Sequence, residues 1–184
     1  IPYLEKHQKK INNTKLNIGT VGRITEARNP KLFNEIALKY PNFNFVWIGD
    51  GDLKNLLSAP NIKITGWIDT QDTVLNNINN LDIYIQTSSW EGLPLAILEA
   101  MALKKPILAT KIIGNKDAVI HNETGFLFDE IEELDQYITV LLNESNRLEI
   151  GEKGYVRCKE YFNNEMNFKE LISLYLKSAL NSKP

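Results

Sequence analysis

The stretch LDIYIQTSSWEGLPLAILEAMA, residues 81–102, decides the fold of this chain. Its apolar run at 82–86 predicts a buried β-strand, and the polar residues 87–92 predict the loop that follows it. Pro94 is suited to the first turn of a helix, which we expect to run to about Leu103. A strand that leads directly into a helix is half of a strand-helix-strand unit, so this stretch predicts a parallel sheet.

The same alternation extends outward from about residue 16 to residue 142. We expect further strands at 16–21, 43–48, 61–65, 106–109 and 125–128. Helices are expected at 30–40, at 71–80, around 114–120 and from about 131 onward, and Asn29-Pro30 is typical of a helix start. The sequence therefore predicts an α/β, Rossmann-like three-layer domain with an open, roughly six-stranded parallel sheet and C-terminal helices.

Composition limits the functional classes. The chain has 184 residues, 43% of them hydrophobic, and 21 basic against 23 acidic residues. This near balance argues against a nucleic-acid-binding surface. No apolar run approaches the roughly 20 residues of a membrane-spanning helix, which predicts a soluble chain. The single cysteine, Cys158, excludes an internal disulfide. The chain begins at Ile1 without a methionine, so we expect it to be an excised piece of a longer protein.

Two glutamates flank the predicted strand-to-helix transition. Glu91 lies in the loop at the carboxyl end of a parallel strand, where open α/β sheets bind ligands. The unpaired N–H groups near 92–95 favour an anion at the helix start. Glu99, one turn further, could accept hydrogen bonds from a sugar diol, although a glutamate on a helix is more commonly a solvated surface charge. Together these groups predict an anion site beside a hydroxyl site.

Two arginines follow the first predicted strand and supply the complementary charge. The guanidinium groups of Arg23 and Arg28 match phosphate oxygens. Either one alone is compatible with an ordinary surface residue. In combination with Glu91 and Glu99, they predict a site that takes a diphosphate at one end and hydroxyls at the other, which is the polarity of a nucleotide-sugar.

Other candidate chemistry is weaker. His7 and His121 are the only histidines, too few for a histidine-rich metal site. Asp50 and Asp52 form a D-x-D triplet that could hold a divalent metal, but its place in a Gly-Asp-Gly-Asp turn favours turn geometry instead. We therefore predict no metal site.

Five ordered motifs give the chain a family resemblance. They are VGRITEARNP from residue 21, IGDG from 48, TGWI from 65, SSWEGLPLAILEAMA from 88 and GNKDAVIHNETGFLF from 114. With these motifs the chain, from about residue 16 to 175, resembles the C-terminal, nucleotide-binding half of group 1 (family four) retaining glycosyltransferases of the GT-B fold. The resemblance implies transfer of a sugar from a nucleoside diphosphate to an acceptor hydroxyl, without a metal or other cofactor.

The resemblance also assigns roles to individual positions. Arg23 corresponds to the family's arginine at the diphosphate, and Arg28 stands where a lysine is more usual. Glu91 matches the glutamate near the donor sugar, and Glu99 matches the one at the ribose. The catalytic set is Glu91, Arg23 and Arg28, and the donor-binding set is Glu99, Gly92, Leu93, Pro94, Leu95, Gly22, Trp67 and Ile68.

The same resemblance implies a domain organisation. Residues 1–13 are expected to be a linker, 14–162 the donor-binding domain, and 163–184 a helix that packs either on its own domain or toward a missing N-terminal domain. The acceptor site would belong to that missing domain, so we expect the chain alone to be inactive. A UDP-sugar is favoured over a GDP-sugar. The resemblance also implies polysaccharide or glycolipid synthesis in the bacterial cytoplasm. The whole protein is expected to associate peripherally with the inner face of the membrane through the missing domain.

Two other functions compete with this interpretation. A nucleotide-sugar epimerase has a similar two-domain shape, and a non-catalytic module could keep the nucleotide-sugar site without the chemistry. The segment from Glu91 to Glu99 favours the transferase over the epimerase. The two arginines and two glutamates argue against a degenerate binding module without excluding it.

Overall fold

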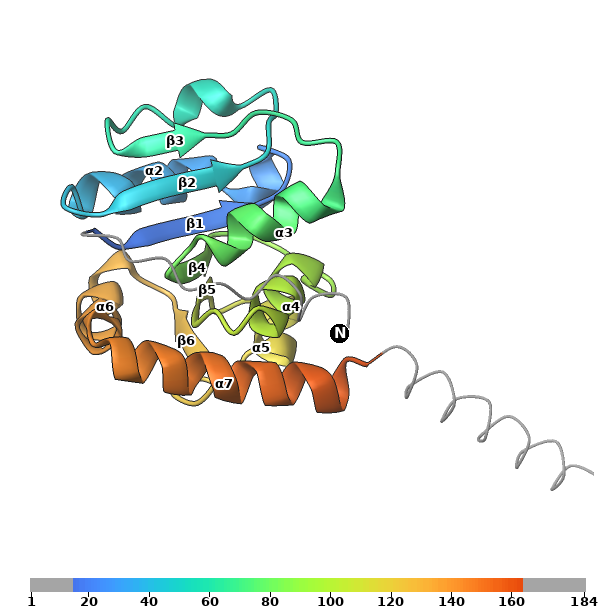
Figure 1. The fold of residues 1–184 in the computed structure, drawn as a ribbon. Coiled ribbons are helices and arrows are strands. Elements are labelled where there is room, and N and C mark those ends of the chain that lie inside the picture. Colours follow the sequence, from blue (N-terminus) through green and yellow to red (C-terminus); the bar gives the residue numbers. More distant parts are fainter. Residues whose placement is uncertain (1–14, 164–184) are drawn as a thin grey trace, which may run out of the picture.

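The computed structural model describes residues 15–163 (Figure 1). The predicted linker 1–13 lies outside the described residues, and so does the predicted terminal helix beyond residue 163. None of the helices in the described part is long and apolar enough to cross a membrane.

Six parallel strands form one sheet, as predicted from the sequence. Their order is β3-β2-β1-β4-β5-β6. The strands are β1 (Asn17–Val21), β2 (Asn44–Ile48), β3 (Ile62–Ile64), β4 (Ile83–Gln86), β5 (Ile107–Thr110) and β6 (Gly125–Phe128). Each lies within one or two residues of its predicted range, because short β-branched runs between polar turns leave little freedom for the strand ends.

Helices cover both faces of the sheet and make the predicted three layers (Figure 1). They are α2 (Pro30–Lys39), α3 (Gln71–Asn79), α4 (Leu95–Ala102), α5 (Ile113–Ala118), α6 (Leu134–Leu142) and α7 (Glu144–Tyr161). One core contains Phe33 of α2 and Leu141 of α6. The other core contains Leu75 of α3, Met101 of α4 and Cys158 of α7. Two single-turn 3-10 helices, η1 (Glu26–Arg28) and η2 (Lys54–Leu56), were not predicted, whereas a third, η3 (Ile131–Glu133), begins where helices were expected.

Two helix starts test the local predictions. The side chain of Asn29 accepts a hydrogen bond from the Leu32 N–H at 3.2 Å and Pro30 is the first residue of α2, so the predicted cap is confirmed. The predicted start of α4 at Pro94 is early by one residue. Pro94 has φ −79° and ψ 80°, which is not helical, and α4 begins at Leu95.

The strand order reverses direction at β1, which pairs with β2 on one side and with β4 on the other. The connections that leave β1 and β4 therefore diverge to opposite faces of the sheet. In open α/β sheets, this switch point is where ligands bind.

Candidate functional site

The loops that follow β1 and β4 are tied together at the switch point. Thr87 Oγ1 donates to the backbone oxygen of Arg28 at 2.9 Å, and the Ser89 N–H donates to the Ala27 oxygen at 2.9 Å. These bonds join residues about sixty positions apart in the chain. They bring Arg28, at the end of η1, beside Glu91.

Arg28 and Glu91 form a largely buried ion pair. The Nη1 atom of Arg28 lies 3.0 Å from Glu91 Oε1, and the two side chains are 24% and 14% exposed. That distance satisfies an ion pair, but the Nη1 atom has no hydrogen bond of acceptable geometry within residues 15–163. The guanidinium lies over Gly22, where a Cβ atom would come within 3.3 Å of Arg28 Cζ. Arg28 is thus fixed in place, with one buried nitrogen that lacks a hydrogen bond within the described residues.

Two further residues hold Glu91, and neither was predicted from the sequence. Gln86 Nε2 and Ser88 Oγ each donate to Glu91 Oε1 at 2.7 Å. Both donors belong to fully buried residues. The available signal was a polar side chain that closes an otherwise apolar strand, with residues 84, 86 and 88 alternating onto one face.

Arg23 is brought to the same edge but in a different environment. Its Nη2 atom lies 3.3 Å from Asp52 Oδ2, and the side chains are 67% and 90% exposed. Arg23 also lines a cavity of about 150 Å³ with Gly22, Trp67 and Ile68. The structure therefore gathers these four predicted residues, with Arg23 turned toward Asp52 rather than Glu91.

Glu99 projects from α4 toward α3. Its Oε1 atom is 3.5 Å from Gln71 Nε2, a long contact, and burial raises the pKa of its carboxyl. Burial raises the pKa of Tyr84, and the charges of Arg28 and Glu99 act on it in opposite directions. No hydrogen bond or ion pair joins Glu99 to the other predicted site residues within the described range.

The start of α4 offers fewer free backbone donors than predicted. Pro94 has no N–H, and the Leu95 N–H donates to the Leu93 oxygen at 3.0 Å. The expectation of unpaired N–H groups near 92–95 therefore does not hold for Leu95. Within residues 15–163, the Leu93 N–H donates no backbone hydrogen bond, and it lies next to exposed Gly92.

The residues considered for metals have structural partners. Asp50 Oδ1 accepts a hydrogen bond from the Gly51 N–H at 2.8 Å, the turn role expected for it. His121 Nδ1 accepts from the Leu127 N–H at 3.0 Å, whereas His7 lies outside the described residues. Residues 15–163 contain no group of three histidine, cysteine or acidic side chains that could hold a metal ion.

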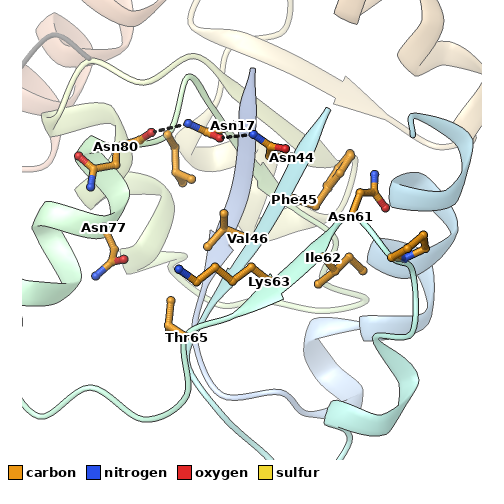
Figure 2. Close-up of a pocket in the computed structure, with 12 residues that line it drawn as sticks. Asn17, Asn44, Phe45, Val46, Asn61, Ile62, Lys63, Thr65, Asn77 and Asn80 are labelled. Carbon is orange, nitrogen blue, oxygen red and sulfur yellow. Dashed lines mark hydrogen bonds between the residues drawn. The ribbon is translucent and has the colours of Figure 1, made fainter. Parts of the chain in front are cut away.

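A second groove, of about 500 Å³, lies along β1, β2 and β3 and contains none of the predicted site residues (Figure 2). Asparagine amides line much of it. The Asn44 amide donates to Asn17 Oδ1 at 3.0 Å, and the Asn17 amide donates to the Asn80 oxygen at 3.3 Å. The amide groups of Asn44 and Asn17 are thus occupied within the protein, and the groove holds none of the charged residues predicted for the site, so the switch point remains the better candidate.

The fold and the site define a Rossmann-like α/β domain whose charged groups gather at the ligand-binding edge of the sheet. Within that class, the chain belongs to the group 1 glycosyl transferases, because the model of this family matches residues 4–157.

Curated relatives support the same assignment. The chain is 31% identical to an Escherichia coli protein named UDP-Gal:alpha-D-GlcNAc-diphosphoundecaprenol alpha-1,3-galactosyltransferase, over 88% of this chain and 45% of that protein. It is 28% identical to the capsular polysaccharide biosynthesis glycosyltransferase CapM of Staphylococcus aureus, over 94% of this chain and 49% of that protein. The chain thus spans about half the length of the curated relatives it matches.

A solved structure agrees with the fold. The C-terminal domain of the group 1 glycosyl transferase LpcC from Francisella tularensis superposes with a TM-score of 0.69 at 25% identity. The match covers 81% of this chain and 87% of that domain. The described fold is therefore that of a C-terminal GT-B domain.

Proposed function

We propose that this chain is the donor-binding domain of a retaining glycosyltransferase, which moves a sugar from a nucleoside diphosphate to an acceptor hydroxyl. The observation that carries the proposal is the Arg28–Glu91 pair at the switch point. Arg28 Nη1 is buried without a hydrogen bond of good geometry within the described residues, although it lies 3.0 Å from a carboxylate. Because 24% of the Arg28 side chain remains exposed at this edge, its guanidinium is a suitable partner for a phosphate oxygen.

The remaining predicted residues extend this site in two directions. Arg23 would meet the diphosphate from the exposed side, and Gly92 and Leu93 from the start of α4. Trp67 and Ile68 would face the base across the cavity that they share with Arg23. Glu99 would accept hydrogen bonds from the ribose hydroxyls. The donor named for the Escherichia coli relative supports a UDP-sugar over a GDP-sugar.

The chemical difficulty of this transfer is charge separation. An oxocarbenium-like sugar forms as the diphosphate leaves with increased negative charge. Arg23, Arg28 and the N-terminus of α4 would stabilise that anion where it develops, so the proposed chemistry requires no metal ion. Glu91 would position the sugar, and the acceptor would attack the face from which the diphosphate departs, which retains the anomeric configuration.

The acceptor site would be supplied by an N-terminal domain, and the active site would close between the two domains. We therefore expect the 184-residue chain to bind a nucleotide-sugar weakly and not to turn it over. The names of the two curated relatives support polysaccharide or glycolipid synthesis as the setting. That setting would place the whole protein at the inner face of the cytoplasmic membrane, with membrane contact through the N-terminal domain.

A binding panel tests the proposal. The chain is titrated with UDP, GDP, ADP and their sugar conjugates by calorimetry or NMR. The variants Arg23→Ala and Glu99→Ala, each of which removes one predicted ligand contact, are titrated in parallel. We expect one nucleotide to bind in the micromolar to millimolar range and both variants to bind it more weakly. Absence of binding at millimolar nucleotide, or equal binding by both variants, contradicts the site. Transfer activity of the chain alone contradicts the need for a second domain.

A further inference from the structure

Glu91 is held by a buried hydrogen-bond network that the proposed chemistry does not itself require. Its Oε1 atom lies 2.7 Å from both Gln86 Nε2 and Ser88 Oγ, and 3.0 Å from Arg28 Nη1. Gln86 Nε2 also lies 3.0 Å from Ser88 Oγ. Two hydrogen bonds and one ion pair thus converge on one oxygen of the carboxylate.

The orientation of Gln86 is set from its other end. The hydroxyl of Tyr84 donates to Gln86 Oε1 at 2.8 Å. Burial raises the pKa of Tyr84 to about 12, so its hydroxyl stays protonated near neutral pH and remains a donor. If the Gln86 amide were flipped, its oxygen would face Glu91 Oε1, and the hydrogen bonds to Glu91 and from Tyr84 would be lost. The amide therefore has one favourable orientation, with its N–H groups toward Glu91.

Tyr84 is fixed in turn by the core. It is fully buried, and its hydroxyl lies 3.4 Å from the Val21 N–H at the end of β1. The network therefore runs from the carboxyl end of β1 through β4 to Glu91. A carboxylate held in this way loses little rotamer entropy on binding, which is how supporting residues improve ligand recognition.

We infer that Gln86 and Ser88 are positioning residues that saturate Glu91 Oε1 and leave Oε2 as the acceptor for a hydroxyl of the donor sugar. This inference rests on the proposed function, because it assigns the sugar to Glu91. It predicts that both residues act on the sugar and not on the nucleotide, and that both act only through Glu91.

The test is a pair of double-mutant cycles on the 184-residue chain, with UDP and UDP-galactose as ligands. Gln86→Met and Ser88→Ala each remove one donor to Glu91. Each is combined with Glu91→Ala, and NMR titration measures the dissociation constants. We expect either single variant to weaken UDP-galactose binding by about tenfold, the scale of one hydrogen bond to a charged group, and UDP binding by less than about twofold. In the Glu91→Ala background, neither change should weaken UDP-galactose binding further.

Thr124→Val is the matched control, because it also deletes a buried hydroxyl. Thr124 Oγ1 bonds the backbone of Ile120 in the loop before β6, away from Glu91. It should lower stability without changing the ratio of the two dissociation constants. If the losses are additive in the double variants, or if both single variants bind UDP-galactose as well as the parent does, the inference is overturned and the proposed function still stands. If the parent chain binds neither ligand, the proposed function fails, and the inference fails with it.

Discussion

Two arginine–carboxylate pairs stand on the same edge of the sheet and are built in opposite ways. Arg28 and Glu91 have side chains 24% and 14% exposed, and buried donors hold the carboxylate. Arg23 and Asp52 are 67% and 90% exposed. An exposed pair of this kind contributes roughly 0–1 kcal/mol to stability, whereas disrupting a buried one costs more. We call the Arg28–Glu91 pair the fixed half of this edge, because it is built into the fold. We call the Arg23–Asp52 pair the open half, because a ligand can rearrange it.

The largest effect should come from disturbing the backbone under the fixed half. A Cβ atom on Gly114, at the start of α5, would collide with the carbonyl oxygens of Gly92 and Glu91. We expect Gly114→Ala to lower the free energy of unfolding by roughly 2–3 kcal/mol, as overpacking does, and to abolish nucleotide-sugar binding. Urea denaturation and ligand titration measure the two losses.

Gly92→Ala is the matched control on the same loop. A Cβ atom there meets nothing within 4 Å, so stability should change by less than about 0.5 kcal/mol. Equal stability losses in the two variants would show that the Glu91 loop is not wedged against α5.

The second test exchanges one arginine in each half for methionine, which keeps an unbranched stem. Arg28→Met leaves a largely buried carboxylate short of one partner, so we expect a stability loss of roughly 1–3 kcal/mol. Arg23→Met breaks an exposed pair and should cost less than about 0.5 kcal/mol. Both should weaken UDP binding by at least roughly tenfold, because each removes a charge-assisted contact to phosphate.

Denaturation curves and UDP titrations of the same preparations separate stability from binding. The contrast fails if Arg23→Met destabilises the chain as much as Arg28→Met. It also fails if Arg28→Met binds UDP as well as the parent does.

The fixed and open halves also differ in how far sequence could predict them. The strands and the cap at Asn29 followed from local patterns, since apolar periodicity and turn residues act over a few positions. The placement of Arg23, Arg28 and Glu91 at one edge followed from the rule that the loops after parallel strands lie at the same edge of the sheet. The partner of each side chain could not be predicted in this way. Arg28 pairs with Glu91 across 63 positions, and its rotamer depends on tertiary contacts that the sequence alone does not specify.

Gln86 illustrates the same limit. A glutamine at the end of an apolar strand indicates a buried polar group, but its partner depends on how the loop after β4 folds back. Likewise, the bond between the Leu95 N–H and the Leu93 oxygen could not be foreseen, because it depends on the ψ angle of Pro94.

A smaller effect concerns Glu99, which stands apart from both halves. Burial raises the pKa of its carboxyl, so it takes up a proton at a higher pH than an ordinary glutamate. A raised pKa means that the folded chain favours the protonated form, so this group contributes stability as pH falls through its folded pKa and loses it as pH rises. The pH dependence of ligand affinity has the opposite sign. Affinity falls as the pH falls, because the ionised carboxylate is the stronger acceptor for ribose hydroxyls.

We therefore expect UDP affinity to fall by about fivefold as the pH is lowered from about 7.5 to about 5, in part through Glu99. The phosphate of UDP titrates near pH 6 as well, so Glu99→Gln is measured in parallel to remove that shared effect. The parent-to-variant affinity ratio should decrease with falling pH. A constant ratio would show that Glu99 does not bind the ribose.

The smallest expected effect tests whether the open half is free to rearrange. Asp52 competes with phosphate for Arg23, so Asp52→Asn should raise UDP affinity by about twofold at low salt, and by less at 0.5 M salt, where exposed charges are screened. Asp129→Asn is the matched control, because it removes the same charge from another exposed pair, with Lys111, and should leave UDP affinity unchanged. A gain in both variants would reflect net charge rather than competition. A gain in neither would mean that Arg23 reaches its ligand without leaving Asp52, and the open half would then be as fixed as the Arg28–Glu91 pair.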